Sequence, residues 1–288
     1  MRTALALLLS LAGPLMAQSP PRVVIPLPDR DFDLTEVVVP WDALTRAGYQ
    51  VVFATERGPA GPVPECDPRL IDEPLLRALR LTAREEYVGL YRRMRESPQL
   101  RAPIGWSEID PAASAGLVLP GGHWKRGMRQ YLEGEALRPK VLEFFRLGRP
   151  VAAICHGPIV LARTLDPATG KSVLHGRRVA ALTKPMEKSA WILTRLKLGD
   201  YYRTYEQTVE DEVKAALGPE GRFERGPFAT QFYAAFGPGH VTLDGNLVTA
   251  RFPGDAHAWA QAYLRLLQAS APATPLPGPG LSGAVQGE

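Results

Sequence analysis

From residue 22 onward, short apolar runs alternate with longer stretches in which apolar residues recur at helical spacing. Residues Asp244-Gly245 separate two short alternating runs, 240–243 and 247–250, as expected for a hairpin turn. The apolar runs predict strands at residues 22–27, 50–54, 116–119, 150–154 and 178–182. The amphipathic stretches predict helices at 34–47, 73–95, 128–147, 159–164, 184–198, 208–217 and 256–268. This alternation is typical of an α/β domain with a mostly parallel sheet.

The two ends of the chain depart from this pattern. Residues 1–17 combine a basic start, an apolar run too short to span a bilayer and a small residue, Ala17, where cleavage would occur. We therefore expect a signal peptide, an exported (periplasmic or secreted) protein and no membrane association after cleavage. A buried first strand or a misassigned start codon, which would leave the protein cytoplasmic, is the alternative. The Pro/Gly-rich residues 270–288 predict a disordered tail, so the domain covers 22–268.

Composition excludes several classes of protein. Of the 288 residues, 45% are hydrophobic and 22% charged, which is typical of a soluble globular protein and not of a disordered or multi-span membrane chain. The formal charge of +4 is spread along the chain, so we expect no nucleic-acid partner. Two cysteines cannot build a disulfide framework, and His175, His240 and His257 lack metal-ligand spacing. We therefore predict no metal.

The most informative motif begins where the apolar strand 150–154 ends. Cys155 follows this strand directly, and the small-residue turn His156-Gly157-Pro158 leads into the next helix. A nucleophile held on a sharp strand-to-helix turn has this layout. A helix N-terminus and a neighbouring histidine would lower the pKa of the thiol. The alternative is a buried structural cysteine at a strand end.

A second motif ends the neighbouring predicted strand. Gly121-Gly122-His123 follows residues 116–119, and ligand sites in open parallel sheets lie beyond the carboxyl ends of the strands. Bare backbone amides at this place could stabilise an oxyanion near Cys155. An ordinary turn is the alternative, although the coincidence of both motifs at strand ends favours a site.

These residues resemble the PfpI superfamily, the class I glutamine amidotransferase-like proteins that include the Parkinson-linked deglycase and the heat-shock glyoxalase III chaperones. The resemblance covers about residues 22–268 and rests on Asp33-Leu34-Thr35-Glu36-Val37, Leu119-Pro120-Gly121-Gly122-His123, Ala153-Ile154-Cys155-His156-Gly157-Pro158, residues 183–187 and residues 244–249. It implies a flavodoxin-like three-layer α/β/α sandwich, with residues 73–95 and part of 190–237 as helical insertions. It also implies a homodimer that needs no cofactor.

The resemblance assigns roles residue by residue. Cys155 would be the nucleophile and Glu36 the carboxyl that hydrogen-bonds its sulfur. His156 would transfer protons and Glu187 would orient it, although Glu187 could equally belong to a solvated helix face. Oxyanion and substrate contacts would come from Gly121, Gly122 and His123 together with the His156 amide.

The chain also departs from the family. Trp124 stands where the family usually has a small residue, which puts the shape of the pocket in doubt. The aromatic stretch within 190–237 is longer than the common core and favours packing of an inserted cap over a substrate platform. The late His257 lacks the acid two residues on that glutaminases of this fold require, so glutaminase chemistry is disfavoured.

Three functions remain open. The first is a cysteine enzyme acting on reactive carbonyls, either converting methylglyoxal to lactate or removing early glycation adducts. The second is an amidase or peptidase that uses the same nucleophile on an amide substrate. The third is a non-enzymatic chaperone or a redox-sensing protein.

Overall fold

The computed structural model describes residues 19–227 and 239–270, so the predicted signal peptide, and the predicted tail except for Ser270, lie outside the described residues. Seven strands form the central sheet in the order β10-β11-β7-β6-β1-β3-β5. All neighbours are parallel except β10 and β11, which form the predicted hairpin. The strands are β1 (Arg22–Pro26), β3 (Gln50–Thr55), β5 (Ile104–Gly105), β6 (Gly116–Leu119), β7 (Val151–Ile154), β10 (Val241–Asp244) and β11 (Leu247–Ala250).

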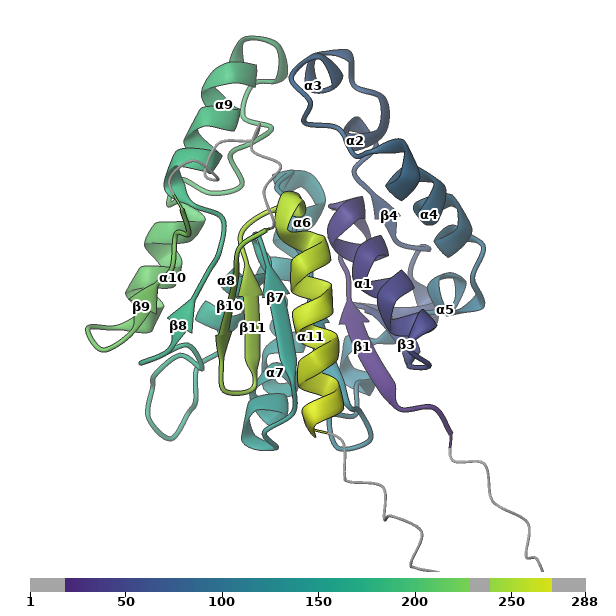
Figure 1. Cartoon of the computed structure of the whole chain (residues 1–288), viewed down its shortest axis with the longest axis vertical. Coiled ribbons are helices and arrows are strands. Elements are labelled where there is room, and N and C mark those ends of the chain that lie inside the picture. The colour runs from purple at the N-terminus through teal and green to yellow at the C-terminus, as the bar shows by residue number, and fades with distance from the viewer. Residues whose placement is uncertain (1–18, 228–238, 271–288) are drawn as a thin grey trace, which may run out of the picture.

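Helices cover both faces of this sheet (Figure 1). One face carries α1 (Leu34–Arg46) and α11 (Ala256–Ser270), which pack on each other, with α4 (Glu85–Arg95) outside α1. The opposite face carries α6 (Lys125–Leu132), α7 (Leu137–Arg146), α8 (Gly157–Ala162) and α10 (Val209–Leu217). The predicted three-layer α/β/α sandwich is confirmed.

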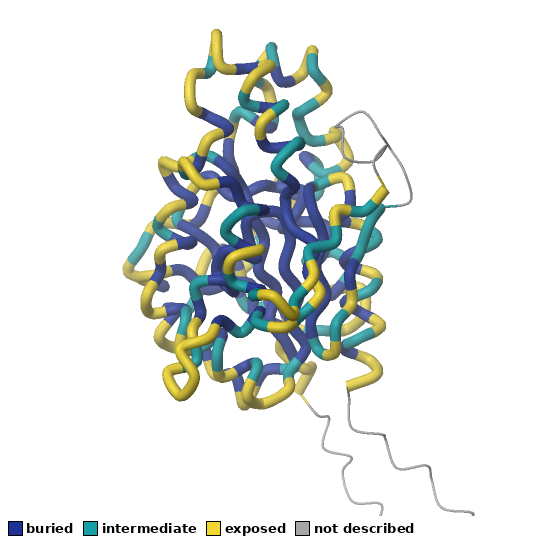
Figure 2. Tube along the Cα trace, turned by 90° about the vertical axis from the view of Figure 1, so that its left-hand side faces the viewer, coloured by how far each residue is buried: buried dark blue, intermediate teal, exposed yellow. Residues whose placement is uncertain are grey.

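The hydrophobic core surrounds the inner strands of the sheet, and β7 is one of its fully buried strands. Every residue of β7 and α8 is buried, because helices cover β7 on both faces and α8 packs between the sheet and α10. Figure 2 shows this buried centre as a continuous dark region surrounded by exposed helices and loops. A wholly apolar strand such as Val151–Ile154 is stable only in this position.

Two long predicted helices are each broken in two. The stretch 73–95 contains α3 (Pro74–Ala78) and then α4, separated at Arg80, whose φ of +58° cannot continue a helix. The stretch 128–147 divides between α6 and α7 at Gly134, where a Cβ would lie 2.7 Å from the Trp106 ring. Glycine at this position lets the chain between the two helices pass close to the Trp106 ring.

The predicted strand 178–182 shortens to β8 (Arg178–Val179), which pairs with β9 (Arg222–Phe223) outside the central sheet. It cannot join beside β7 or β11, because both edges of each strand are already paired. Residues 56–72, for which the sequence predicts neither helix nor strand, contain short elements. The remaining elements are β2 (Arg30–Phe32), η1 (Gly58–Ala60), β4 (Glu65–Cys66), α2 (Arg69–Asp72), α5 (Pro98–Arg101), η2 (Trp106–Glu108), α9 (Lys184–Leu198) and η4 (Pro253–Asp255).

No helix within residues 19–227 and 239–270 has the length and apolar character needed to cross a membrane.

Candidate active site

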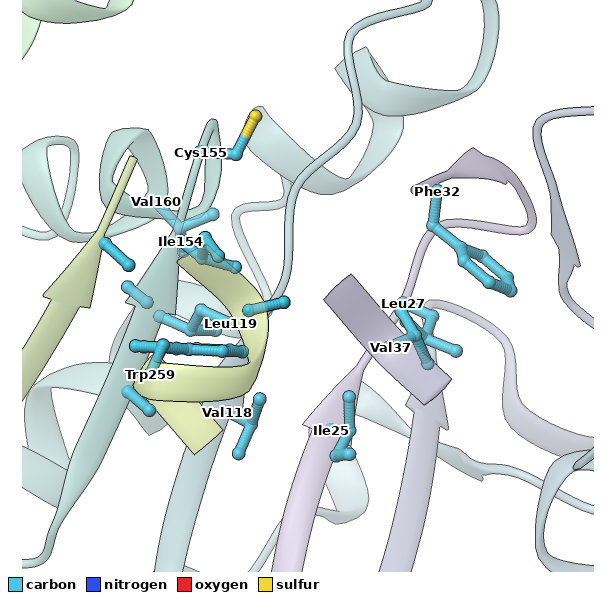
Figure 3. Close-up of a cluster of buried hydrophobic side chains, with 14 of the residues drawn as sticks. Ile25, Leu27, Phe32, Val37, Val118, Leu119, Ile154, Cys155, Val160 and Trp259 are labelled. Atoms are coloured by element: carbon cyan, nitrogen blue, oxygen red, sulfur yellow. The ribbon is translucent and has the colours of Figure 1, made fainter. Parts of the chain in front are cut away.

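Cys155 occupies a sharp turn between β7 and α8. Its φ is +60°, which is uncommon for a residue with a side chain and costs about 1–3 kcal/mol. The turn is held because the Cys155 amide donates to Ala250 O and its carbonyl accepts from the Leu182 amide, both over 3.2 Å. The side chain is 5% exposed and points away from the hydrophobic cluster around Ile154 (Figure 3). This is the geometry of the predicted nucleophile elbow.

Glu36 is brought to this thiol by the first turn of α1. Asp33 caps that helix by accepting the amides of Thr35 and Glu36, and the Glu36 side chain is fully buried. The carboxyl group accepts the Gly121 amide at Oε2 over 2.8 Å and lies beside the Cys155 thiol, whose pKa it raises. Burial, followed by the neighbouring Asp33, raises the pKa of Glu36 well above its ordinary value. Burial therefore favours the neutral, protonated form of Glu36.

The Gly-Gly turn after β6 closes the opposite side of the site. A Cβ at Gly121 would lie 2.7 Å from the His156 amide nitrogen and 2.8 Å from Cys155 Cβ, so no larger residue fits there. The Gly121 amide is engaged by Glu36, and this leaves it unavailable to a substrate oxyanion. The Gly122 amide makes no hydrogen bond with any other described residue. The His156 amide contacts the Cys155 sulfur.

His156 is fully buried beside the thiol. Its Nδ1 lies 3.4 Å from Cys155 Sγ, and its Nε2 lies 3.1 Å from Thr204 Oγ1. Burial, with a smaller contribution from Arg163, lowers the pKa of His156 to about 3. The ring is therefore neutral in the resting site, and one of its two nitrogens is unprotonated.

Glu187, the residue expected to orient His156, lies elsewhere. It stands in the first turn of α9, and its Oε2 accepts the Val209 amide at the start of α10 over 3.0 Å. Within the described residues, the hydrogen bonds of the His156 ring go to Cys155 and Thr204. The structure thus places Thr204, and not Glu187, on the imidazole. Sequence reasoning missed Thr204, which lies in an irregular segment after α9 and carries no motif.

His123 and Trp124 pack against the aromatic residues that follow α9. The His123 ring stacks on Tyr202 with centroids 4.2 Å apart and meets Tyr201 edge-on at 4.6 Å. Tyr201 also contacts Trp124 and donates its hydroxyl to Asp67 over 2.7 Å. Both tyrosines are buried, which agrees with the expectation that this part of 190–237 packs as a cap. Some of the other aromatic residues between positions 190 and 237 lie outside the described residues.

The expectation of a lowered thiol pKa at Cys155 is wrong for this geometry. Burial is the largest cause, with Glu36 and Asp33 next, and together they raise the pKa of Cys155 well above its ordinary value. The helix N-terminus considered from the sequence is outweighed because the sulfur is removed from water. The resting thiol is therefore protonated, and a base must take its proton when it reacts.

Cys66, the other cysteine, lies in β4. It is buried, forms no disulfide, and burial raises its pKa to about 12. Across the part of the chain that the structure describes, no three His, Cys, Asp or Glu side chains gather as a metal site would require.

Comparison with known proteins places this site in a family. Residues 27–227 match the family model described as ThiJ/PfpI family-like. A deglycase of Thermococcus kodakarensis is 26% identical over 197 residues, which cover 67% of this chain and 89% of the relative. Glyoxalase 3 of Candida albicans is 22% identical over 232 residues, covering 77% and 84% of the two chains.

The fold agrees with this match. The crystal structure of glyoxalase III from Candida albicans aligns with a TM-score of 0.62 at 17% identity, covering 85% of this chain and 97% of that one. At this identity the alignment supports the shared architecture only. Because the family model spans most of the domain that carries the Cys155 elbow, the chain belongs to the ThiJ/PfpI family.

Proposed function

We propose that this protein is a Cys155-dependent enzyme that acts on reactive carbonyl compounds and needs no cofactor. The observation that carries the proposal is the position of one thiol between a neutral acid, Glu36, and a neutral imidazole, His156. A protonated thiol with a base on one side and a proton donor on the other suits addition to an aldehyde. The relatives named deglycase and glyoxalase support this substrate class.

The first chemical step uses both neighbours of the sulfur. His156 Nδ1 takes the thiol proton while Sγ bonds to the aldehyde carbon, and the carbonyl oxygen becomes an oxyanion. The amides of Gly122 and His156 stabilise this oxyanion, and a proton from Glu36 or His156 completes the hemithioacetal. The Gly121 amide has a supporting role, since it holds the Glu36 carboxyl in place.

With methylglyoxal, a second proton transfer gives lactate. A base removes the proton from the carbon bonded to sulfur, and reprotonation at the neighbouring carbon converts the hemithioacetal into a thioester. Water then cleaves the thioester, which releases lactate and regenerates the thiol. The sum is methylglyoxal plus water to lactic acid, so no oxidant or external thiol is required. On an early glycation adduct, the same thiol would attack the sugar-derived carbonyl carbon.

The test compares wild type with Cys155→Ala and with the matched control Cys66→Ala, in the absence of glutathione. We expect methylglyoxal consumption and lactate release in wild type and Cys66→Ala, and neither in Cys155→Ala. Lactate release by Cys155→Ala at the wild-type rate would refute the proposal. Amide cleavage that depends on Cys155 would favour an amidase, and client protection that survives Cys155→Ala would favour a chaperone.

A further inference from the structure

The Thr204 hydroxyl lies between two groups of the active site. Its oxygen contacts the His123 carbonyl and also lies 3.1 Å from His156 Nε2. Thr204 itself is 1% exposed, so water does not compete for these contacts. The hydroxyl therefore connects the Gly-Gly-His turn to the imidazole.

The directions of these two hydrogen bonds follow from the groups involved. A carbonyl oxygen can only accept, so the single hydroxyl proton of Thr204 points to His123 O. The hydroxyl oxygen must then accept a hydrogen bond from the Nε2–H of His156. A neutral imidazole carries only one N–H, so Nδ1 has a free lone pair. That lone pair faces Cys155 Sγ, 3.4 Å away.

The position of Thr204 is itself held from the opposite side. Arg129, from α6, donates Nε and Nη2 to the Thr204 carbonyl over 3.2 and 3.1 Å. The Arg129 guanidinium also lies over the Tyr205 ring, 4.9 Å from its centroid. Arg129 thus anchors the irregular segment after α9 at Thr204, whose hydroxyl contacts the His156 imidazole.

The geometry points to Thr204 as a positioning residue that selects the Nε2–H tautomer of His156 and so leaves Nδ1 free to take the Cys155 proton. With the opposite tautomer, Nδ1 would donate to the sulfur and could not act as its base. The low pKa of His156 agrees with this role, because it keeps the ring neutral. This inference rests on the proposed function only in taking Cys155 as the nucleophile.

The test replaces Thr204 with Val, which keeps the shape and removes the hydroxyl, and with Ser, which restores it. Alkylation of Cys155 by iodoacetamide is followed against pH by mass spectrometry, and ¹⁵N NMR reports the protonated nitrogen of His156. We expect the wild-type Nδ1 to be unprotonated. Thr204→Val should shift the proton to Nδ1 and slow alkylation at neutral pH by about tenfold or more, and Thr204→Ser should recover most of the rate.

Thr194→Val is the matched control. Thr194 is also fully buried, but its hydroxyl donates to Ala190 O within α9, away from the site. The Thr194→Val variant should therefore leave the alkylation rate of Cys155 and the protonated nitrogen of His156 unchanged. The charged neighbours of the pair stay in place in every variant, namely Glu36 and Asp33 near the thiol and the Arg163–Glu212 ion pair near the imidazole.

Two results would overturn the inference. One is an Nδ1–H tautomer in wild type, which can be read even if Thr204→Val fails to fold. The other is a Thr204→Val protein that folds, as judged by thermal unfolding, and alkylates Cys155 as fast as wild type. Neither readout uses a carbonyl substrate, so absence of lactate formation would refute the proposed function while leaving this inference standing.

Discussion

The backbone amide of Gly121 donates to Oε2 of Glu36 over 2.8 Å, and the same carboxyl group lies beside the thiol of Cys155 and raises its pKa. The turn after β6 therefore holds the acid that α1 brings to the nucleophile. Because Gly121 has no side chain, the turn can approach both Cys155 and His156 closely. The site depends on this contact between three separate segments of the chain.

Glu36→Gln should change the reactivity of Cys155 little, whereas Glu36→Ala should change it strongly. The neutral glutamine side chain keeps the shape of the protonated acid and can still accept the Gly121 amide. Alanine removes the carboxyl group that, after burial, helps to raise the pKa of Cys155, so this pKa should fall. The rate of Cys155 alkylation, followed against pH, measures this effect in both variants. Equal rate-against-pH profiles for Glu36→Gln and Glu36→Ala would show that the side chain at position 36 has no role in the ionisation of Cys155.

Gly121→Ala should destabilise the protein and disturb the site. The added methyl group would lie within 3 Å of the His156 amide nitrogen, Cys155 Cβ and Glu36 Oε2, an overlap that costs about 1–3 kcal/mol. Gly89→Ala is the control, because nothing lies within 4 Å of a Cβ there and it sits inside α4. It should stabilise by about 0.5–1 kcal/mol. Denaturant unfolding of both variants measures the difference, and a neutral Gly121→Ala would contradict the close packing of the turn.

Glu187→Gln should change how stability depends on pH. Burial raises the pKa of Glu187 from 4.5 to about 7, so the folded state binds more protons than the unfolded state between these values. The contribution of Glu187 to the free energy of unfolding is therefore full below about pH 4.5 and is lost as pH rises through 7. Glutamine still accepts the Val209 amide but does not ionise.

Relative to wild type, Glu187→Gln should therefore gain stability between pH 4.5 and 7.5, by up to about 3 kcal/mol. Urea unfolding of the two proteins at a series of pH values tests this, and other titrating groups cancel in the difference. A difference that does not vary with pH would mean that Glu187 ionises normally in the folded protein.

Asp255→Asn should be among the most destabilising single changes. Asp255 and Arg251 are both 1% exposed, and the guanidinium donates to both carboxylate oxygens, over 2.8 and 2.9 Å. Removing one charge of a buried pair costs about 3–5 kcal/mol. Asp42→Asn, which breaks the exposed pair with Arg46, is the control and should cost at most about 0.5 kcal/mol. Thermal unfolding distinguishes the two, and similar melting temperatures would contradict the burial of the Arg251–Asp255 pair.

Local patterns in the sequence determined the order of the elements and the placement of the nucleophile. The apolar run ending at Ile154 and the sequence Cys155-His156-Gly157 after it predict the turn. They can do so because strand burial and glycine geometry act over a few neighbouring residues. The apolar and amphipathic segments likewise predicted most of the central strands, and the helix that carries Glu36. The periodicity did not predict the break between α6 and α7 at Gly134, where the chain passes close to Trp106.

Only the tertiary structure decided which side chains complete the site. Thr204 reaches His156 because Arg129 and the aromatic residues around His123 hold an irregular segment in place, and no local pattern encodes that contact. Glu187 is drawn instead to the Val209 amide. The ionisation of Cys155 also depends on atoms from other segments, because desolvation and the nearness of Glu36 exist only once those segments are packed around the sulfur.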